Sequence, residues 1–118
     1  MTRDEFDTYC KSLKSTTHVI QWGDASVWKI GGKVFAIHSG FKGKNEHALS
    51  FKCSELNFEI LCDQPDIIPA PYLARGKWVQ LLSKEAMSNK DSEDYIKASY
   101  DIISKKLTKK LQSELKLI

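Results

Sequence analysis

Three short stretches in the first half of the chain alternate hydrophobic and polar residues with a period of two. Residues 26–30 and 33–39 are separated by the pair Gly31-Gly32, and a third stretch covers residues 47–53. A period of two is typical of half-buried strands, and two adjacent glycines can adopt the positive φ angles of a type I′ turn. The pattern therefore predicts an antiparallel meander of three strands.

The same alternation assigns the side chains of this meander to two faces. The face with the larger apolar side chains, which should contact helices, carries Trp28, Ile30, Phe35, Ile37, Leu49 and Phe51. The other face carries Val27, Lys29, Val34, Ala36, His38, Ala48, Ser50 and Lys52. Because these side chains are small, polar or basic, we expect the second face to be open to solvent or to a ligand.

Helical patterns flank the meander. Thr2 and Glu5 are spaced as in a capping box and predict the start of a helix. Its apolar stripe follows at helical spacing through Phe6, Tyr9, Cys10 and Leu13. Ser54 is the expected cap of a short helix that ends near Cys62. The apolar contacts of that short helix should be Leu56, Ile60 and Leu61.

The second half of the chain predicts one more strand and a long helix. Residues 63–71 contain all three prolines, so this connection should be stiff and non-helical, and residues 78–82 return to strand character. Asp91 or Ser92 can cap the last helix, with Glu93 and Asp94 in its first turn. Its buried stripe should be Ile96, Tyr100, Ile103, Leu107 and Leu111.

Together with a short edge strand at residues 18–22, these elements follow the order α-β-β-β-β-α-β-α. Helices at both ends of a run of strands predict an α+β fold, in which the terminal helices pack on one face of an antiparallel sheet. A chain of 118 residues can build one hydrophobic core, so we expect a single domain over residues 1–118.

Composition adds few constraints. Charged residues make up 28% of the chain and hydrophobic residues 42%, which is typical of globular proteins and excludes disorder. The net charge of +3 permits an anionic partner without requiring one. Three cysteines without a Cys-x-x-Cys pair indicate reduced thiols. The charged N-terminus and the absence of a long apolar run predict a cytoplasmic protein that makes no membrane contact.

The sequence indicates no enzyme, metal or cofactor. No residue next to Cys10, Cys53 or Cys62 would activate a thiol, and the Gly40-x-x-Gly43 pattern lacks the strand-to-helix context of a phosphate loop. The acidic residues at positions 4, 5 and 7 are too few for an iron-binding ridge and fit a helix N-terminus.

Basic residues give the stronger functional signal. The meander and its tips carry Lys29, Lys33, Lys42, Lys44 and Lys52. Arg75 and Lys77 precede Trp78, which should be exposed on the open face beside Gln80. Lysines at hairpin tips with an aromatic ring for stacking are typical of a nucleic-acid surface. The alternative is that these lysines are simply solvated and that Trp78 packs under a loop. The C-terminal lysines 105, 106, 109 and 110 fit a solvated helix end.

Several motifs in the expected order resemble the MmcQ/YjbR family. They are Trp22-Gly23-Asp24, Lys29-Ile-Gly-Gly-Lys33-Val-Phe35, Leu49-x-Phe-Lys52-Cys53, Pro69-Ala-Pro-Tyr72-Leu, Lys77-Trp78-Val79 and residues 99–107. The resemblance implies a CyaY-like (frataxin-like) fold and DNA binding by two hairpins that act as a double wing. The wings here would be the Gly31-Gly32 hairpin and the loop at residues 40–46. Leu73-Ala74 and Lys77 replace residues of many members, including histidines, so no role of those histidines transfers.

We therefore predict a small non-enzymatic DNA-binding protein with weak sequence preference. Lysines of the wings would contact phosphates, and Trp78 with Gln80 would contact bases or sugars. The alternative is a protein- or small-ligand-binding module that uses the same open face around Trp78.

Overall fold

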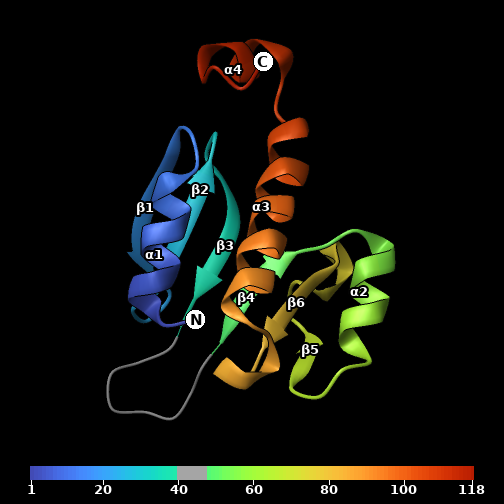
Figure 1. Ribbon diagram of the computed structural model, residues 1–118. Helices are drawn as coiled ribbons and strands as arrows, with labels where there is room; N and C mark the ends of the chain where they lie inside the picture. Colours follow the sequence, from blue (N-terminus) through green and yellow to red (C-terminus); the bar gives the residue numbers. More distant parts are fainter. Residues whose placement is uncertain (40–47) are drawn as a thin grey trace.

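The computed structural model describes residues 1–39 and 48–118 and has an α+β architecture, as predicted (Figure 1). Its antiparallel sheet has the strand order β1-β2-β3-β4-β6-β5. The strands are β1 Thr16–Gln21, β2 Ala25–Ile30, β3 Lys33–His38, β4 Leu49–Lys52, β5 Ile67–Pro69 and β6 Trp78–Leu81. The α-helices are α1 Arg3–Ser12, α2 Glu55–Cys62, α3 Asn89–Lys105 and α4 Lys109–Glu114, and η1 Ala74–Gly76 and η2 Lys84–Ala86 are 3₁₀ turns. Figure 1 shows α1 and α3 on the same face of the sheet.

The predicted meander is confirmed. β2 and β3 pair antiparallel around Gly31 and Gly32, whose φ angles of 59° and 81° are those of a type I′ turn. β3 then pairs with β4. Gly31 also meets a tertiary requirement, because a Cβ atom there would lie 2.6 Å from Cδ1 of Leu107.

The structure corrects the strict alternation that the sequence predicts for β3. Trp28 pairs with Ala36, whereas the next residue, Lys29, pairs with Val34. β3 therefore holds one extra residue, Phe35, at a β-bulge.

The bulge changes which residues of β3 face the helices. Phe35 and Ala36 both lie in the helix-facing core, and Ile37 lies on the second face beside Val27, opposite to the prediction. His38 follows Ala36 to the helix side, where its ring lies 5.4 Å from the ring of Phe6. The helix-facing positions predicted in the other strands are confirmed: Trp28, Ile30, Leu49 and Phe51.

The first helix begins as its sequence predicts. The Thr2 side chain accepts a hydrogen bond from the Glu5 backbone N–H, and the Glu5 carboxylate accepts one from the Thr2 N–H at 2.8 Å. The bond from the Thr2 N–H lowers the pKa of the Glu5 carboxyl, because a donor to the carboxylate favours its charged form. Phe6 and Cys10 are fully buried against the sheet.

The last helix begins earlier and ends earlier than predicted. Its cap is Ser88, whose side chain accepts a hydrogen bond from the Asp91 N–H, rather than Asp91 or Ser92. The helix ends at Lys105, and Thr108 caps the separate helix α4. Leu107 and Leu111 still continue the apolar stripe, because the turn between the helices carries both side chains onto Gly31.

Two further differences concern residues 54–71. Ser54 caps α2 as predicted, but Leu56 and Ile60 are 67% and 47% exposed, and Leu61 is the buried residue. The proline-containing connection is non-helical, as predicted, and within it Ile67–Pro69 forms β5 at the edge of the sheet beside β6. Proline is tolerated there because an edge strand leaves backbone N–H groups unpaired.

The main core lies between the sheet and the helices. Its largest fully buried side chains are Phe6, Phe35, Phe51, Ile30, Leu49 and Ile96. Burying each of them contributes roughly 1.5–3 kcal/mol, so this layer is the main source of stability. Across residues 1–39 and 48–118, no helix has both the length and the apolar character to cross a membrane.

Candidate nucleic-acid interface

The second face of the sheet is not open around Trp78. The Trp78 side chain points to this face as predicted, but it is only 8% exposed. Ala25, Val27, Ile37 and Ala70 form a small buried cluster with it. The prediction of an exposed ring is therefore wrong, and the indole has no free face on which a base could stack.

The connection between β5 and β6 helps to hold Trp78. The Ala70 N–H donates to the Trp78 carbonyl at 2.9 Å, and a Cβ on Gly76 would lie 3.4 Å from Cδ1 of the indole. The turn η1 thus lies against one edge of the ring. Gln80 is half-buried, and its amide nitrogen donates to Ser50 Oγ at 3.4 Å.

The two predicted wings are attached to opposite ends of β3. The Gly31-Gly32 turn precedes Lys33, whereas His38 pairs with Leu49 at the other end, where residues 40–47 connect the strands. Six residues of strand separate these ends by about 17 Å. Lys29 is half-buried on β2 and Lys33 is exposed at the start of β3. Lys42 and Lys44 lie outside the described residues.

Three lysines meet at the same end of the sheet as the Gly31-Gly32 turn. Lys52 ends β4, and its Nζ donates a hydrogen bond to the Gly76 carbonyl. Burial lowers the pKa of the Lys52 ammonium, and the nearby side chain of Lys106 and the charge of Lys77 lower it further. Lys52 is the last residue of β4, Lys77 lies between η1 and β6, and Lys106 is the C-cap of α3. We call Lys52, Lys77 and Lys106 the lysine cluster.

The conformation of Lys77 directs it to this end of the molecule. It is the C-cap of η1 in the left-handed region, with φ 62° and ψ 40°, and its Nζ lies 5.1 Å from the centre of the Phe58 ring. Arg75, two residues earlier in η1, is exposed. Among the described residues, no carboxylate forms an ion pair with a member of the lysine cluster.

Lys106 is the member of the cluster that sequence reasoning assigned to a solvated helix end. Its neighbour Leu107 and the preceding Ile103 belong to the buried stripe of the last helix. The spacing of Ile103 and Leu107 indicates that the end of α3 packs toward the sheet. Which strand it contacts depends on tertiary packing.

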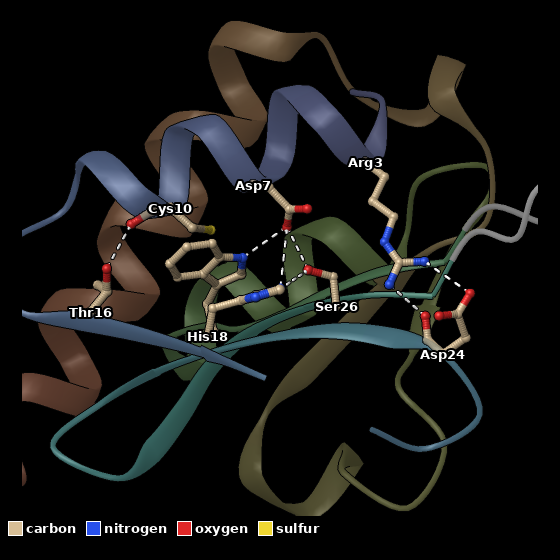
Figure 2. Close-up of polar contacts among 8 residues, drawn as sticks. Arg3, Asp7, Cys10, Thr16, His18, Asp24 and Ser26 are labelled. Carbon is tan, nitrogen blue, oxygen red and sulfur yellow. Dashed lines mark hydrogen bonds and ion pairs between the residues drawn. The ribbon is translucent and has the colours of Figure 1, made fainter. Parts of the chain in front are cut away.

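A separate polar cluster joins α1 to β1 and β2, as Figure 2 shows. Ser26 Oγ donates to Asp7 Oδ1 at 2.5 Å, and the Trp28 indole N–H donates to the same oxygen at 2.9 Å. His18 Nε2 lies 2.8 Å from Ser26 Oγ. Because the Ser26 proton is directed at Asp7, we assign the His18 proton to Nε2, which then donates to Ser26. Ser26 is fully buried, so this cluster holds the elements together and offers no accessible nucleophile.

Two of the three cysteines, Cys10 and Cys53, are buried in this fold. Burial raises the pKa of the Cys53 thiol to about 12 and also raises that of Cys10 well above its usual range. Both thiols are therefore protonated at neutral pH. Within residues 1–39 and 48–118, no group of three or more His, Cys, Asp or Glu side chains is placed to hold a metal ion.

Comparison with known proteins gives a family and a fold. The family model YjbR matches residues 11–102. The crystal structure of the Deinococcus radiodurans protein DR2400, with a DUF419 domain, superposes with a TM-score of 0.82 at 22% identity, over 97% of this chain and 87% of that one. At this identity the likeness concerns the fold alone. A search of curated proteins finds no match. Likeness to the CyaY-like (frataxin-like) fold remains a prediction from the sequence.

Proposed function

The chain belongs to the YjbR family, and on this premise we propose that it is a small non-enzymatic protein that binds the phosphate backbone of DNA. The premise matters because the family resemblance carries the expectation of DNA binding.

The observation that carries the proposal is the lysine cluster. Lys106 and Lys77 both lie near enough to Lys52 for their charges to lower its pKa, and no described carboxylate pairs with any of the three. The positive charges of neighbouring ammonium groups repel one another, and a bound anion relieves this repulsion. A DNA backbone supplies a row of phosphates and releases its counterions on contact.

Other basic side chains extend this surface. Lys33 is exposed beside the Gly31-Gly32 turn, and Arg75 is exposed in η1. Trp78 is buried, and Gln80 is half-buried and bonded to Ser50, so the proposal keeps contacts to phosphates and drops the base contacts that the sequence suggested. Binding by phosphate contacts alone predicts little sequence preference.

The test is titration of a fluorescent duplex of about 20 base pairs at low salt, a length that covers two turns of groove. We expect Lys77→Gln with Lys106→Gln to weaken binding at least tenfold, because about 1.4 kcal/mol of lost phosphate contact corresponds to a factor of ten. The control variant is Lys11→Gln with Lys84→Gln. It removes the same amount of charge at exposed positions outside the lysine cluster.

Two results would overturn the proposal. One is absence of binding to duplex DNA at low salt. The other is a loss of affinity in the control variant as large as that in the Lys77→Gln, Lys106→Gln variant. Such a result would show that only the net charge of the protein matters. The contribution of the second wing is tested separately by Lys42→Glu with Lys44→Glu, which should weaken binding if the DNA also contacts that loop.

The alternative function, a protein- or small-ligand-binding module around Trp78, gains no support from the burial of that ring. It predicts that the Gln variants of the lysine cluster bind their partner normally.

A further inference from the structure

A pocket of about 460 Å³ lies where the end of α1, the second half of α3 and the C-terminal residues meet. Figure 1 shows α4 lying across the C-terminal end of α3. Lys116, Leu117 and Ile118, which follow α4, line one side of this space. The volume lies within the range of roughly 300–1,000 Å³ that is usual for small-molecule sites. Leu13, Tyr100 and Leu117 provide apolar walls.

Four lysines line the same pocket: Lys14, Lys97, Lys105 and Lys116. Lys97 is paired with Asp101 at 2.6 Å, and the other three form no ion pair with a described carboxylate. Helices α1, α3 and α4 also end here, and a helix C-terminus carries roughly half a negative charge. Four ammonium groups outweigh one carboxylate and three such ends, so the pocket keeps a positive balance.

A buried hydroxyl adds an independent observation. Ser104 lines the pocket, is only 8% exposed, and its Oγ has no hydrogen-bond partner among the described residues. Buried hydroxyls are nearly always bonded, so an unpaired one calls for an explanation. Because Ser104 belongs to the pocket wall, this unpaired donor lies beside the space.

We propose that this pocket binds a small amphipathic anion, with an oxyanion head held by Lys14, Lys105 and Lys116. The Ser104 hydroxyl donates to the head, and the apolar part of the ligand lies against Leu13, Tyr100 and Leu117. The site is separate from the lysine cluster and does not depend on DNA binding.

The experiment uses four probes on the full chain: octyl phosphate, octanoate, inorganic phosphate and octanol, with the amphiphiles kept below their micelle concentrations. Amide NMR shifts should report saturable binding of octyl phosphate or octanoate at Ser104, Lys105 and Leu117. The amphiphile that binds should have a Kd at least tenfold below the Kd values of inorganic phosphate and of octanol. Only the amphiphile contacts both the apolar walls and the lysines of the pocket. The two amphiphiles distinguish a phosphate from a carboxylate head.

Variants locate the binding. Lys14→Gln with Lys116→Gln should raise the Kd about tenfold, whereas Lys11→Gln, one turn back on α1 and outside the pocket, should leave it unchanged. Ser104→Ala should weaken binding while the free protein melts at the same or a higher temperature, because the variant removes an unpaired hydroxyl.

The proposal is overturned if neither amphiphile binds saturably, if octanol binds as tightly as both of them, or if Lys11→Gln costs as much affinity as the pocket variants.

Discussion

Asp7 holds the N-terminal helix to the first two strands through one carboxylate oxygen. That oxygen accepts hydrogen bonds from Ser26 and from the Trp28 indole, and His18 lies 3.9 Å away (Figure 2). In the sequence Asp7 is one of three acidic residues near the start of a helix. Nothing in the local sequence distinguishes its role from that of Asp4 or Glu5. Its role depends on residues about twenty positions later in the chain.

Removing this acceptor should cost the fold much of its stability. Asp7→Ala leaves the Trp28 N–H and the Ser26 hydroxyl without their acceptor, and each such loss costs about 1–3 kcal/mol. We therefore expect a loss of at least about 2 kcal/mol in urea unfolding. Thr8→Ala, at the exposed neighbouring position, should change stability by less than about 0.5 kcal/mol. Equal effects of the two variants would contradict this role of Asp7.

The cysteines allow a second test at this scale. Because burial raises the pKa of Cys53 to about 12, its thiolate is scarce at pH 8, and the same holds for Cys10. Iodoacetamide should label half-buried Cys62 first, and the other two only after denaturation, as read by mass spectrometry. Since the unfolded chain ionises its thiols at a lower pH than the folded chain does, folding stability should fall as the pH rises through the unfolded pKa. Rapid labelling of native Cys53 would contradict its burial.

At the scale of elements, the β2–β3 turn and the end of α3 depend on each other. Both turn glycines have positive φ, but only Gly31 faces Leu107 and Leu111, whereas a Cβ on Gly32 would meet nothing within 4 Å. The local sequence predicts the turn equally from either glycine. The contact with the last helix distinguishes them.

Alanine substitutions should separate local strain from this contact. Gly32→Ala should cost about 1–2 kcal/mol, the usual penalty of a left-handed non-glycine residue. Gly31→Ala should cost more, because its methyl group also collides with the buried side chain of Leu107. In a Leu107→Ala background most of the extra cost should disappear, since the variant removes the two Cδ atoms that collide and leaves only the looser contact with Leu111. Thermal unfolding of the unmodified protein, the three single variants and the Gly31→Ala, Leu107→Ala double variant measures these costs. If Gly31→Ala costs as much stability in the Leu107→Ala background as in the unmodified protein, the contact with Leu107 is not the cause.

At the scale of the whole molecule, charge is distributed along the long helices. The starts of α1 and α3 carry acidic residues and lie side by side, since Asn89 donates to Glu5 at 2.7 Å. The lysine cluster lies beside the end of α3, next to the Gly31-Gly32 turn. Such a distribution orients the molecule in the field of a polyanion and steers its approach.

Salt dependence measures how many phosphates this end engages. The three lysines of the cluster alone predict a slope of about −2.7 in log K against log salt, so a fourfold rise in salt should lower affinity by at least about 40-fold. Lys77→Gln with Lys106→Gln should reduce the slope by about 1.8, whereas Lys11→Gln with Lys84→Gln should leave it unchanged. A slope near zero in the unmodified protein would exclude phosphate-dominated binding.

Much of the fold could be predicted from sequence because its signals are local. The Gly31-Gly32 turn, the Thr2–Glu5 capping box and the Ser54 cap each involve residues within a few positions of one another, and all are present. The fold class followed from the order of these elements.

Long-range packing decided the rest. Strict alternation misplaced Ile37 because the extra residue Phe35 fills the core against Tyr100, with ring centres 5.4 Å apart. Trp78 is covered because the β5–β6 connection returns to it. The meeting of Lys52 with Lys106 joins residues more than fifty positions apart. Periodicity and capping act over a single turn, so the sequence by itself determined the elements and their class, whereas their packing determined which side chains meet.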